Sequence, residues 1–251
     1  MHFYLPLAIM KAMAYKYETH LHTSEASACA SSPAADYIEA FYKAGYSGIF
    51  VTDHFFGGNT CVSNELDWKS RVDLYCKGYE NALAQAEIFN QKNKLKGSDK
   101  EFKVFFGLEQ TFQGDDYLIY GLNKEWLINH PQVETMNHMQ LFEAVNQENG
   151  LMIQAHPFRL RGYMQAIHLH PREVHGIEVY NAGNKPSENQ LAELYAKEYD
   201  FPVTSGSDIH TINKIGDPSS LPLGGMDFEE PLKSIEDYIN NIKNRKGILI
   251  R

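Results

Sequence analysis

The sequence contains little cysteine and comparatively few basic residues. The three cysteines are Cys29, Cys61 and Cys76. An odd and low count gives no disulfide framework and favours the reducing cytoplasm. Lys and Arg number 23 against 32 Asp and Glu, a formal charge of −9. This acidic balance argues against binding to a long nucleic-acid backbone, but a small anionic substrate stays compatible because bound metal ions reverse the local charge.

Long hydrophobic runs and nucleotide-binding motifs are also absent from the sequence. Residues 1–10 are apolar but are broken by Pro6, far short of the roughly 20 apolar residues of a membrane span. No basic stretch precedes them, as it would in a secretory signal peptide. We therefore expect residues 1–14 to be an extension of a single cytoplasmic domain, residues 15–251, without a membrane partner. No G-x-G-x-x-G or G-x-x-x-x-G-K-[ST] sequence occurs, which argues against nucleotide-cofactor folds.

Short apolar runs alternate with longer amphipathic stretches along the chain. Hydrophobic residues make up 43% of the sequence, enough for the packed core of one large domain. The alternation predicts an α/β fold in which helices connect the strands of a parallel sheet. The expected strands lie near residues 15–21, 47–53, 102–109, 116–121, 151–156, 176–181, 202–206 and 247–250. The expected helices lie near residues 33–44, 67–93, 137–149, 187–199 and 230–244.

Two pairs of metal-ligand-type residues stand near opposite ends of the chain. His20-x-His22 follows the first expected strand, and Asp208-x-His210 follows the run Val203 to Ser207. Residues i and i+2 of a strand point to the same side, so each pair directs two side chains at one place. Gly206 lets the backbone come close to its neighbours. The two pairs indicate a closed sheet whose first and last strands meet around metal.

Polar side chains also end the strands between these two pairs. Active sites of barrels gather at the C-terminal ends of several strands, whereas an open doubly wound sheet concentrates its site at one switch point. The pattern therefore favours a barrel. The residues that end these strands are Asp53, His54, Glu109, His156, Glu178 and Asn181.

Some of these residues allow two interpretations. Glu109 ends the apolar run Val-Phe-Phe-Gly-Leu, where an unpaired carboxylate is costly, and its two oxygens suit a ligand that bridges two metals. Asp53 either closes its strand by a hydrogen bond to His54 or orients a neighbouring ligand imidazole. Glu25 is either a further ligand from a loop or a surface acid beside a helix.

His156 precedes Pro157, which fixes the turn after the candidate ligand. Arg159 and Arg161 follow, either as solvated loop residues or as phosphate-binding groups, with Arg159 the better candidate. Cys29 and Cys61 could lie near the site, but the proposed chemistry needs no thiolate, and most lone cysteines are packing residues. Five further histidines lie outside the expected strand ends, and we interpret them as surface or structural residues: His130, His138, His168, His170 and His175.

Taken together, these residues resemble the polymerase-and-histidinol-phosphatase (PHP) family of metal-dependent phosphoesterases. The motifs follow the order of the family and extend over about residues 15–250. They are Thr19-His-Leu-His-Thr23, Gly48-Ile-Phe-Val-Thr-Asp-His54, Phe106-Gly-Leu-Glu109, Gln154-Ala-His-Pro157, Ile177-Glu-Val-Tyr-Asn181 and Gly206-Ser-Asp-Ile-His210.

The resemblance implies a single-domain, distorted TIM-like (β/α)7 barrel that holds two or three metal ions at the C-terminal mouth. By position, one metal would be held by His20, His22, Glu109 and Asp208, a second by Glu109 and His156, and a third by His54, His210 and Glu25. Glu178, Asn181 and Asp53 would support the ligands. The chain departs from the family at Leu118, where many relatives have a histidine, so the second metal would rely on water, substrate or Asp116.

Mixed imidazole and carboxylate ligands suit Zn²⁺, Mn²⁺ or Fe²⁺. Such ions supply hydroxide for in-line attack on phosphorus. Arg159, with Arg161, would bind the phosphate, and Asp208 or a second metal would assist the leaving oxygen. The expected reaction is hydrolysis of a phosphomonoester of a small metabolite or nucleotide, with a phosphodiester as a further option. Two other functions stay open: a metal-dependent amidohydrolase, although no lysine ends an expected core strand, and a non-catalytic, metal-stabilised binding or regulatory module. The sequence indicates no oligomeric state.

Overall fold

A computed structural model describes residues 15–162, 164–216 and 222–251. The expected extension, residues 1–14, and residues 217–221 of the loop before the last helix lie outside the described residues. The strands are β1 Tyr15–Glu18, β2 Gly48–Val51, β3 Lys103–Phe112, β4 Asp115–Tyr120, β5 Leu151–Gln154, β6 Gly176–Asn181, β7 Val203–Gly206, β8 Gly225–Phe228 and β9 Ile248–Ile250. The α-helices are α1 Ala34–Lys43, α2 Trp68–Tyr75, α3 Lys77–Lys92, α4 Lys124–Asn129, α5 His138–Gln147, α6 Pro186–Glu198 and α7 Ile235–Lys243, and the 3-10 helices are η1 Pro131–Thr135 and η2 Ile212–Lys214.

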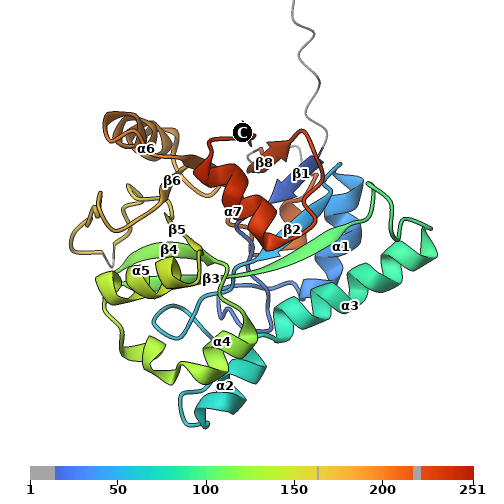
Figure 1. Cartoon of the computed structure of the whole chain (residues 1–251), viewed down its shortest axis with the longest axis horizontal. Coiled ribbons are helices and arrows are strands. Elements are labelled where there is room, and N and C mark those ends of the chain that lie inside the picture. The colour runs from blue at the N-terminus through green and yellow to red at the C-terminus, as the bar shows by residue number, and fades with distance from the viewer. Residues whose placement is uncertain (1–14, 163, 217–221) are drawn as a thin grey trace, which may run out of the picture.

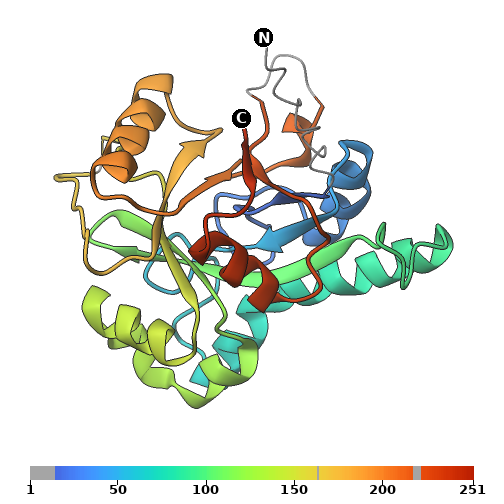
Figure 2. The ribbon, with the colours of Figure 1, turned by 45° about the horizontal axis from the view of Figure 1, so that its top comes forward.

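The strands form one sheet that curves into a nearly closed barrel, with helices packed around it (Figures 1 and 2). Its order is β7-β6-β5-β4-β3-β2-β1-β8-β9. The predicted α/β barrel is confirmed, but the wholly parallel pairing is wrong. Strand β4 runs antiparallel to both β3 and β5, and β8 runs antiparallel to both β1 and β9. The short turn at Gln113 and Gly114 leaves no room for a crossover helix between β3 and β4, so the two strands form a hairpin.

The seam of the barrel closes at the ends of β1 and β7. Leu21 and Ile209 form an isolated parallel bridge just beyond these strands. The amide of His22 donates to the carbonyl of Ile209 at 2.9 Å. The bridge brings the two ligand-type pairs next to each other across the seam, although nearly the whole chain separates them in sequence.

The barrel interior below the mouth is apolar and aromatic. In β4, Leu118 and Tyr120 join the interior cluster, whereas Tyr117 and Ile119 pack outward against the helices, as the two-residue period of a strand requires. Helix α7 closes the end of the barrel opposite the ligands, and the ring of its buried Tyr238 packs at a tilt against Phe50, with centroids 4.4 Å apart. This packing leaves the other end of the barrel available for polar side chains.

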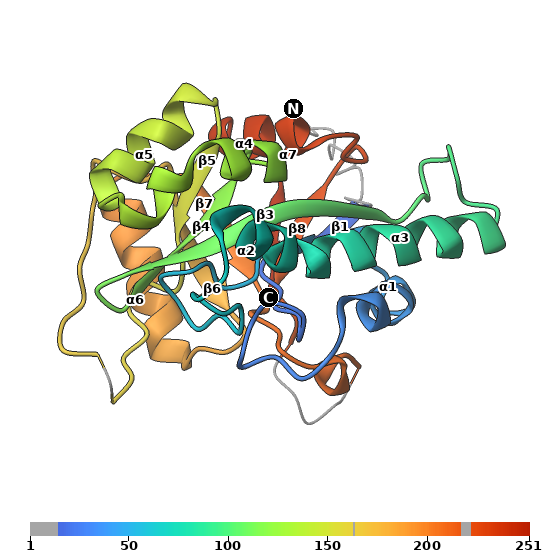
Figure 3. The ribbon, with the colours of Figure 1, turned by 90° about the horizontal axis from the view of Figure 1, so that it is seen from below.

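Helices α1 and α3 cover one flank of the barrel, as Figure 3 shows, and share an outer core with β2. The helix predicted over residues 67–93 is two helices, α2 and α3, which meet at Cys76. Asp67 caps α2 by accepting a hydrogen bond from the Ser70 amide at 3.0 Å. Aspartate is one of the residues that helix N-termini prefer at this position. The helix α4 and the strand β8 were not predicted. No helix among the described residues is both long and apolar enough to cross a membrane.

Candidate metal centre

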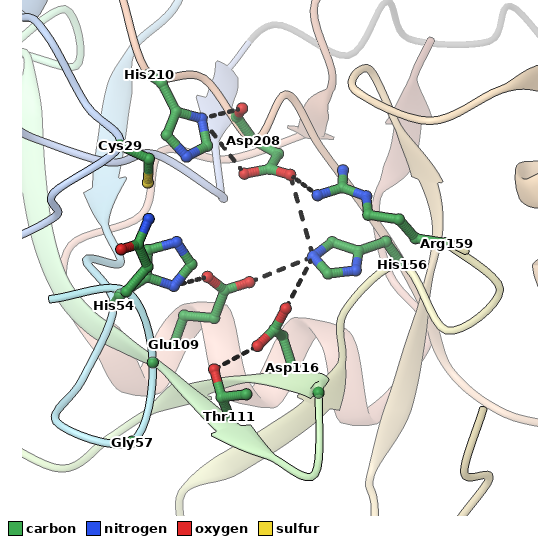
Figure 4. A pocket seen from close by; sticks show the side chains of 13 residues that line it. Cys29, His54, Gly57, Glu109, Thr111, Asp116, His156, Arg159, Asp208 and His210 are labelled. Carbon is green, nitrogen blue, oxygen red and sulfur yellow. Dashed lines mark hydrogen bonds and ion pairs between the residues drawn. The ribbon is translucent and has the colours of Figure 1, made fainter. Parts of the chain in front are cut away.

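Side chains in or just after strands β1, β2, β3, β4, β5 and β7 converge at the open end of the barrel, around the carboxylate of Glu109; Figure 4 shows several of them. His20 Nε2 lies 3.0 Å from Glu109 Oε1, and His54 Nδ1 lies 2.8 Å from Glu109 Oε2. His156 Nε2 approaches Oε1 to 3.3 Å and His22 Nε2 approaches Oε2 to 3.4 Å. Despite these distances, neither Glu109 oxygen has a partner with hydrogen-bond geometry. A buried carboxylate ringed by imidazoles in this way is suited to cations placed between them.

Several sets of ligand atoms in this group lie within 4.8 Å of one another, as the ligands of one ion would. Each set combines imidazoles with carboxylates or further imidazoles, which fits Zn²⁺, Mn²⁺ or Fe²⁺. The sets are His20, His22 and Asp208; Glu109, Asp116 and His156; His22, His54 and His210; and His20, His156 and Glu178.

Neighbouring side chains fix which nitrogen of each imidazole faces the centre. His20 Nδ1 donates to Glu178 Oε1 at 2.9 Å, which leaves Nε2 as the ligand atom. His22 Nδ1 lies 3.2 Å from Ser27 Oγ, and Ser27 donates to Asp53 at 2.6 Å. Asp53 therefore acts on His22 through Ser27 and does not contact an imidazole directly. The contribution of Ser27 was not predicted, because a loop serine carries no sequence signal of this role.

The electrostatics of the centre favour ionised carboxylates. Burial alone would raise the pKa of Glu109, but the charges of His20 and His54 outweigh it and hold this pKa well below the ordinary range. The same balance of burial against the Arg159 charge holds the pKa of Asp208 well below its usual value. Both carboxylates therefore carry negative charge at neutral pH, which is the form that binds metal.

Leu118, where the sequence departs from the family pattern, does not face the centre, whereas Asp116, two residues earlier, does. Leu118 pairs with Glu109 in the hairpin, and its side chain is buried in the apolar interior. Since β4 runs antiparallel to its neighbours, its N-terminal end lies at the mouth, and Asp116 is two residues closer to that end. Its Oδ2 lies 3.8 Å from His156 Nε2. Burial, with the Glu109 charge, raises the pKa of Asp116 to about 6.

The prediction that Glu25 is a metal ligand is wrong. Its carboxylate accepts from the amide of Ala34, at 3.0 and 3.1 Å, and from Asn81. Glu25 thereby caps the start of α1, a use of a carboxylate that helix termini favour. Cys29 takes the place beside His54 and His210 instead (Figure 4). Burial opposes ionisation of this thiol, but hydrogen bonds from His210 and His54 outweigh burial and lower its pKa to about 6.

Arg159 is held at the edge of the centre by three side chains. Its Nε donates to Asn184 at 2.8 Å, one terminal nitrogen donates to Asn181 at 2.7 Å, and the other pairs with Asp208 at 2.5 Å. Each terminal nitrogen keeps a second N–H for a ligand. Arg161, predicted to bind substrate with it, lies outside the cavity and pairs with Glu188 at 3.2 Å. The loop turns between the two arginines, so only Arg159 points inward.

Two ligand residues adopt unusual backbone conformations. His156 has φ +30° and Asp208 has φ +53°, a region that costs residues other than glycine about 1–3 kcal/mol. Gly206 meets the expectation of close packing, because a Cβ there would lie 2.5 Å from His20 Cβ and 2.6 Å from Glu178 Oε1. The surrounding fold thus holds both ligands in conformations that they would not adopt alone.

The centre opens into a cavity of ≈ 560 Å³. This is within the size range of small-molecule sites. Backbone at Gly57, Gly58 and Gly114 forms part of its rim, so the entrance is not blocked by large side chains. The other residues that line it are Cys29, His54, Asn59, Glu109, Thr111, Asp116, His156, Arg159, Asp208 and His210.

Known proteins resemble this chain in sequence and in fold. A family model described as PHP-associated matches residues 186–246, which include Asp208 and His210. These comparisons support the resemblance to the PHP family that the sequence motifs indicate. An uncharacterized protein from Methanocaldococcus jannaschii is 30% identical over 126 residues, 45% of this chain and 53% of that protein. The chain therefore spans about half the length of this curated relative.

Two solved structures share the fold of this chain. A two-domain protein from Bacteroides vulgatus, described as containing a predicted PHP-like metal-dependent phosphoesterase, has a TM-score of 0.63 and 16% identity over 94% of this chain and 64% of that one. A protein from Bifidobacterium adolescentis, whose description assigns it provisionally as a metal-dependent phosphoesterase, has a TM-score of 0.55 and 14% identity over 93% and 97% of the two chains. At such identities the likeness shows the fold, and activity has to be argued from the site.

Proposed function

We propose that this protein hydrolyses a phosphoester with the help of two or three divalent metal ions, Zn²⁺, Mn²⁺ or Fe²⁺. The observation that carries the proposal is the buried Glu109 carboxylate, which four imidazoles approach within 3.4 Å without hydrogen-bond geometry. Ions bound there would lower the pKa of water and neutralise charge on phosphoryl oxygens. Two structural neighbours are described as predicted or provisional metal-dependent phosphoesterases, which supports the same reaction class.

The residues divide into three metal-holding groups in this proposal. His20, His22 and Asp208 form the first group, and Glu109 with Asp116 and His156 forms the second. His54 and His210 form the third together with the Cys29 thiolate, which replaces Glu25. The low pKa of Asp208 favours a role as a ligand over the donation of a proton to the leaving group.

Arg159 binds the phosphate in this mechanism. Its guanidinium is fixed by Asn181 and Asn184, and its free N–H groups suit two phosphate oxygens. Since these side chains hold it before a ligand arrives, little rotamer freedom is lost on binding. Arg159 would therefore orient the phosphorus atom toward the metal groups.

The cavity favours a small substrate. A volume of ≈ 560 Å³ accommodates a phosphorylated metabolite or a nucleotide, and the charge of −9 disfavours a long nucleic acid. No lysine is among the residues that line this cavity, which favours a phosphoester over the amide substrate of an amidohydrolase. We keep the cytoplasmic location as a prediction.

This proposal is tested by measuring turnover. The protein is first freed of metal with a chelator and then reloaded with Zn²⁺, Mn²⁺ or Fe²⁺. The substrates are small phosphomonoesters, a phosphodiester and amides, assayed with the wild type, Glu109→Gln and Glu101→Gln. Glu101 precedes the same strand and bonds Gly97 and Lys103 away from the cavity, so its variant is a matched control. We expect metal-dependent phosphoester hydrolysis that falls at least about 1000-fold in kcat/KM in Glu109→Gln alone, since metal ions supply several kcal/mol of transition-state stabilisation.

Other results would point elsewhere. Metal-dependent cleavage of amides but not phosphoesters would assign the site to an amidohydrolase. Metal binding without any turnover would indicate a binding or regulatory module. Full phosphoester turnover by Glu109→Gln would contradict the proposed metal groups.

A further inference from the structure

A second group of metal-ligand-type side chains lies outside the barrel mouth, on the other face of β4. His138 begins α5, whereas His170 and Glu173 belong to the loop between β5 and β6. The His138 ring packs 4.4 Å from the ring of Tyr117, which faces outward from β4. Asp116, next to Tyr117, faces the mouth. The strand therefore separates this group from the proposed phosphoesterase centre.

The three side chains bring their ligand atoms within 4.8 Å of one another. His138 Nδ1 lies 2.8 Å from Glu173 Oε2, and His170 Nδ1 lies 3.6 Å from the same oxygen. The two imidazole rings stack with centroids 4.0 Å apart. Ligand atoms of a tetrahedral zinc ion lie about 3.3 Å apart, given bonds of about 2.0–2.1 Å. The two measured distances lie on either side of this value.

The chemistry of His138 also suits a ligand. Its side chain is 9% exposed, and its Nε2 has no hydrogen-bond partner among the described residues. Nδ1 of this buried histidine faces Glu173 and is the atom that an ion would take.

We propose that His138, His170 and Glu173 bind one divalent transition-metal ion, with zinc the best match. Two histidines and one glutamate form a donor set that zinc uses with a fourth position open to water. The three side chains line a cavity of ≈ 330 Å³ together with residues that include Phe112, Asn137 and His168. The ion would join the loop after β5, which also carries Arg159, to the start of α5. It would thus stabilise the loop that positions the phosphate-binding arginine.

Zinc titration of chelator-treated full-length protein at micromolar concentration tests this site, with bound zinc counted by equilibrium dialysis. The variants are His170→Ala and Glu173→Gln, and the matched control is His130→Ala, whose imidazole bonds the Trp126 carbonyl away from both centres. We expect each of the two variants to bind one zinc fewer per chain than the wild type and the control, because removal of a ligand weakens a three-ligand site at least about tenfold. Circular dichroism checks that the variants are folded.

Anomalous diffraction at the zinc edge locates the ion independently. A peak within bonding distance of His138, His170 and Glu173 supports the site. Equal zinc counts in all four proteins, or zinc bound there only at millimolar concentration, would overturn it. The outcome does not depend on phosphoesterase activity, because the measured quantity is bound zinc outside the barrel mouth.

Discussion

Arg159 donates to Asn181, Asn184 and Asp208 at once, and this geometry depends on the planar guanidinium. We expect Arg159→Lys to weaken binding of inorganic phosphate to the metal-loaded protein about 30-fold, because a lysine ammonium loses the paired contacts, worth about 2 kcal/mol. Isothermal titration with phosphate measures the effect, and metal content should stay unchanged. Arg161→Lys is the matched control, since Arg161 lies outside the cavity. An equal loss in both variants would refute the assignment of the phosphate to Arg159.

His175 makes stability depend on pH. Its Nδ1 accepts from the Met152 amide at 3.0 Å, and burial, with the nearby Lys243 charge, lowers the pKa of His175 to about 4. The unfolded chain binds this proton near pH 6.5. The unfolded state thus holds more protons between pH 6.5 and 4, and His175 contributes stability that is present above pH 6.5 and lost as the pH falls toward 4.

Urea unfolding at pH 4.5, 5.5, 6.5 and 7.5 measures this contribution. We expect His175→Ala to be less stable than the wild type at pH 7.5 and to lose less stability on acidification. The control His130→Ala should keep the full wild-type slope. Identical slopes for wild type and His175→Ala would contradict the role of His175.

Many site residues were predictable from the sequence because a strand that ends in a ligand leaves a local pattern. His20, His22, Glu109, His156 and Asp208 all meet at the mouth as expected. Glu25 was misassigned because its partner, the Ala34 amide, depends on the path of the loop. Cys29 and Ser27 carry no motif, and their place near His54 and His22 follows only from the fold.

At the scale of elements, the direction of β4 determines which of its residues joins the second metal group. The alternation of residues 115–120 predicts a strand but carries no information on whether that strand runs parallel or antiparallel. The hairpin turn at Gln113 and Gly114 reverses β4, which places Asp116 at the mouth and Leu118 in the core. Periodicity thus identified the strand, whereas pairing had to come from three-dimensional contacts.

Gly78, in the first turn of helix α3, packs against Thr23 and Asp53, which lie behind the metal centre. A Cβ at this position would collide with Thr23 Oγ1 and lie 2.8 Å from Asp53 Oδ2. We expect Gly78→Ala to lower the free energy of unfolding by about 1–3 kcal/mol, as overpacking does. Metal retention should also fall, because Thr23 and Asp53 hold the Ser27 that contacts His22.

Urea denaturation and metal analysis of Gly78→Ala check both effects. Gly162→Ala is the control, because no heavy atom lies within 4 Å of a Cβ there. Unchanged stability and metal content in Gly78→Ala would show that α3 does not support the centre.

For the whole molecule, bound metal and folding are coupled through the ring of strands. Ligands that bind only the native state stabilise it by about 2.7 kcal/mol at a free concentration 100 times Kd. For a chain of this size, each kcal/mol corresponds to about 2–4 °C in Tm. We expect Mn²⁺ or Zn²⁺ to raise the Tm of chelator-treated protein by about 5–10 °C. Most of this rise should be absent in Glu109→Gln, and an equal rise in both proteins would place the stabilising ion elsewhere.

The seam bridge between Leu21 and Ile209 has a consequence for the order of events during synthesis. During synthesis, His20 and His22 leave the ribosome first, and Asp208 and His210 are added only after the intervening residues 23–207. A nascent chain cannot complete the first ligand set before that point. Full metal loading is therefore a late step, and it shows that the two strands on either side of the seam have come together.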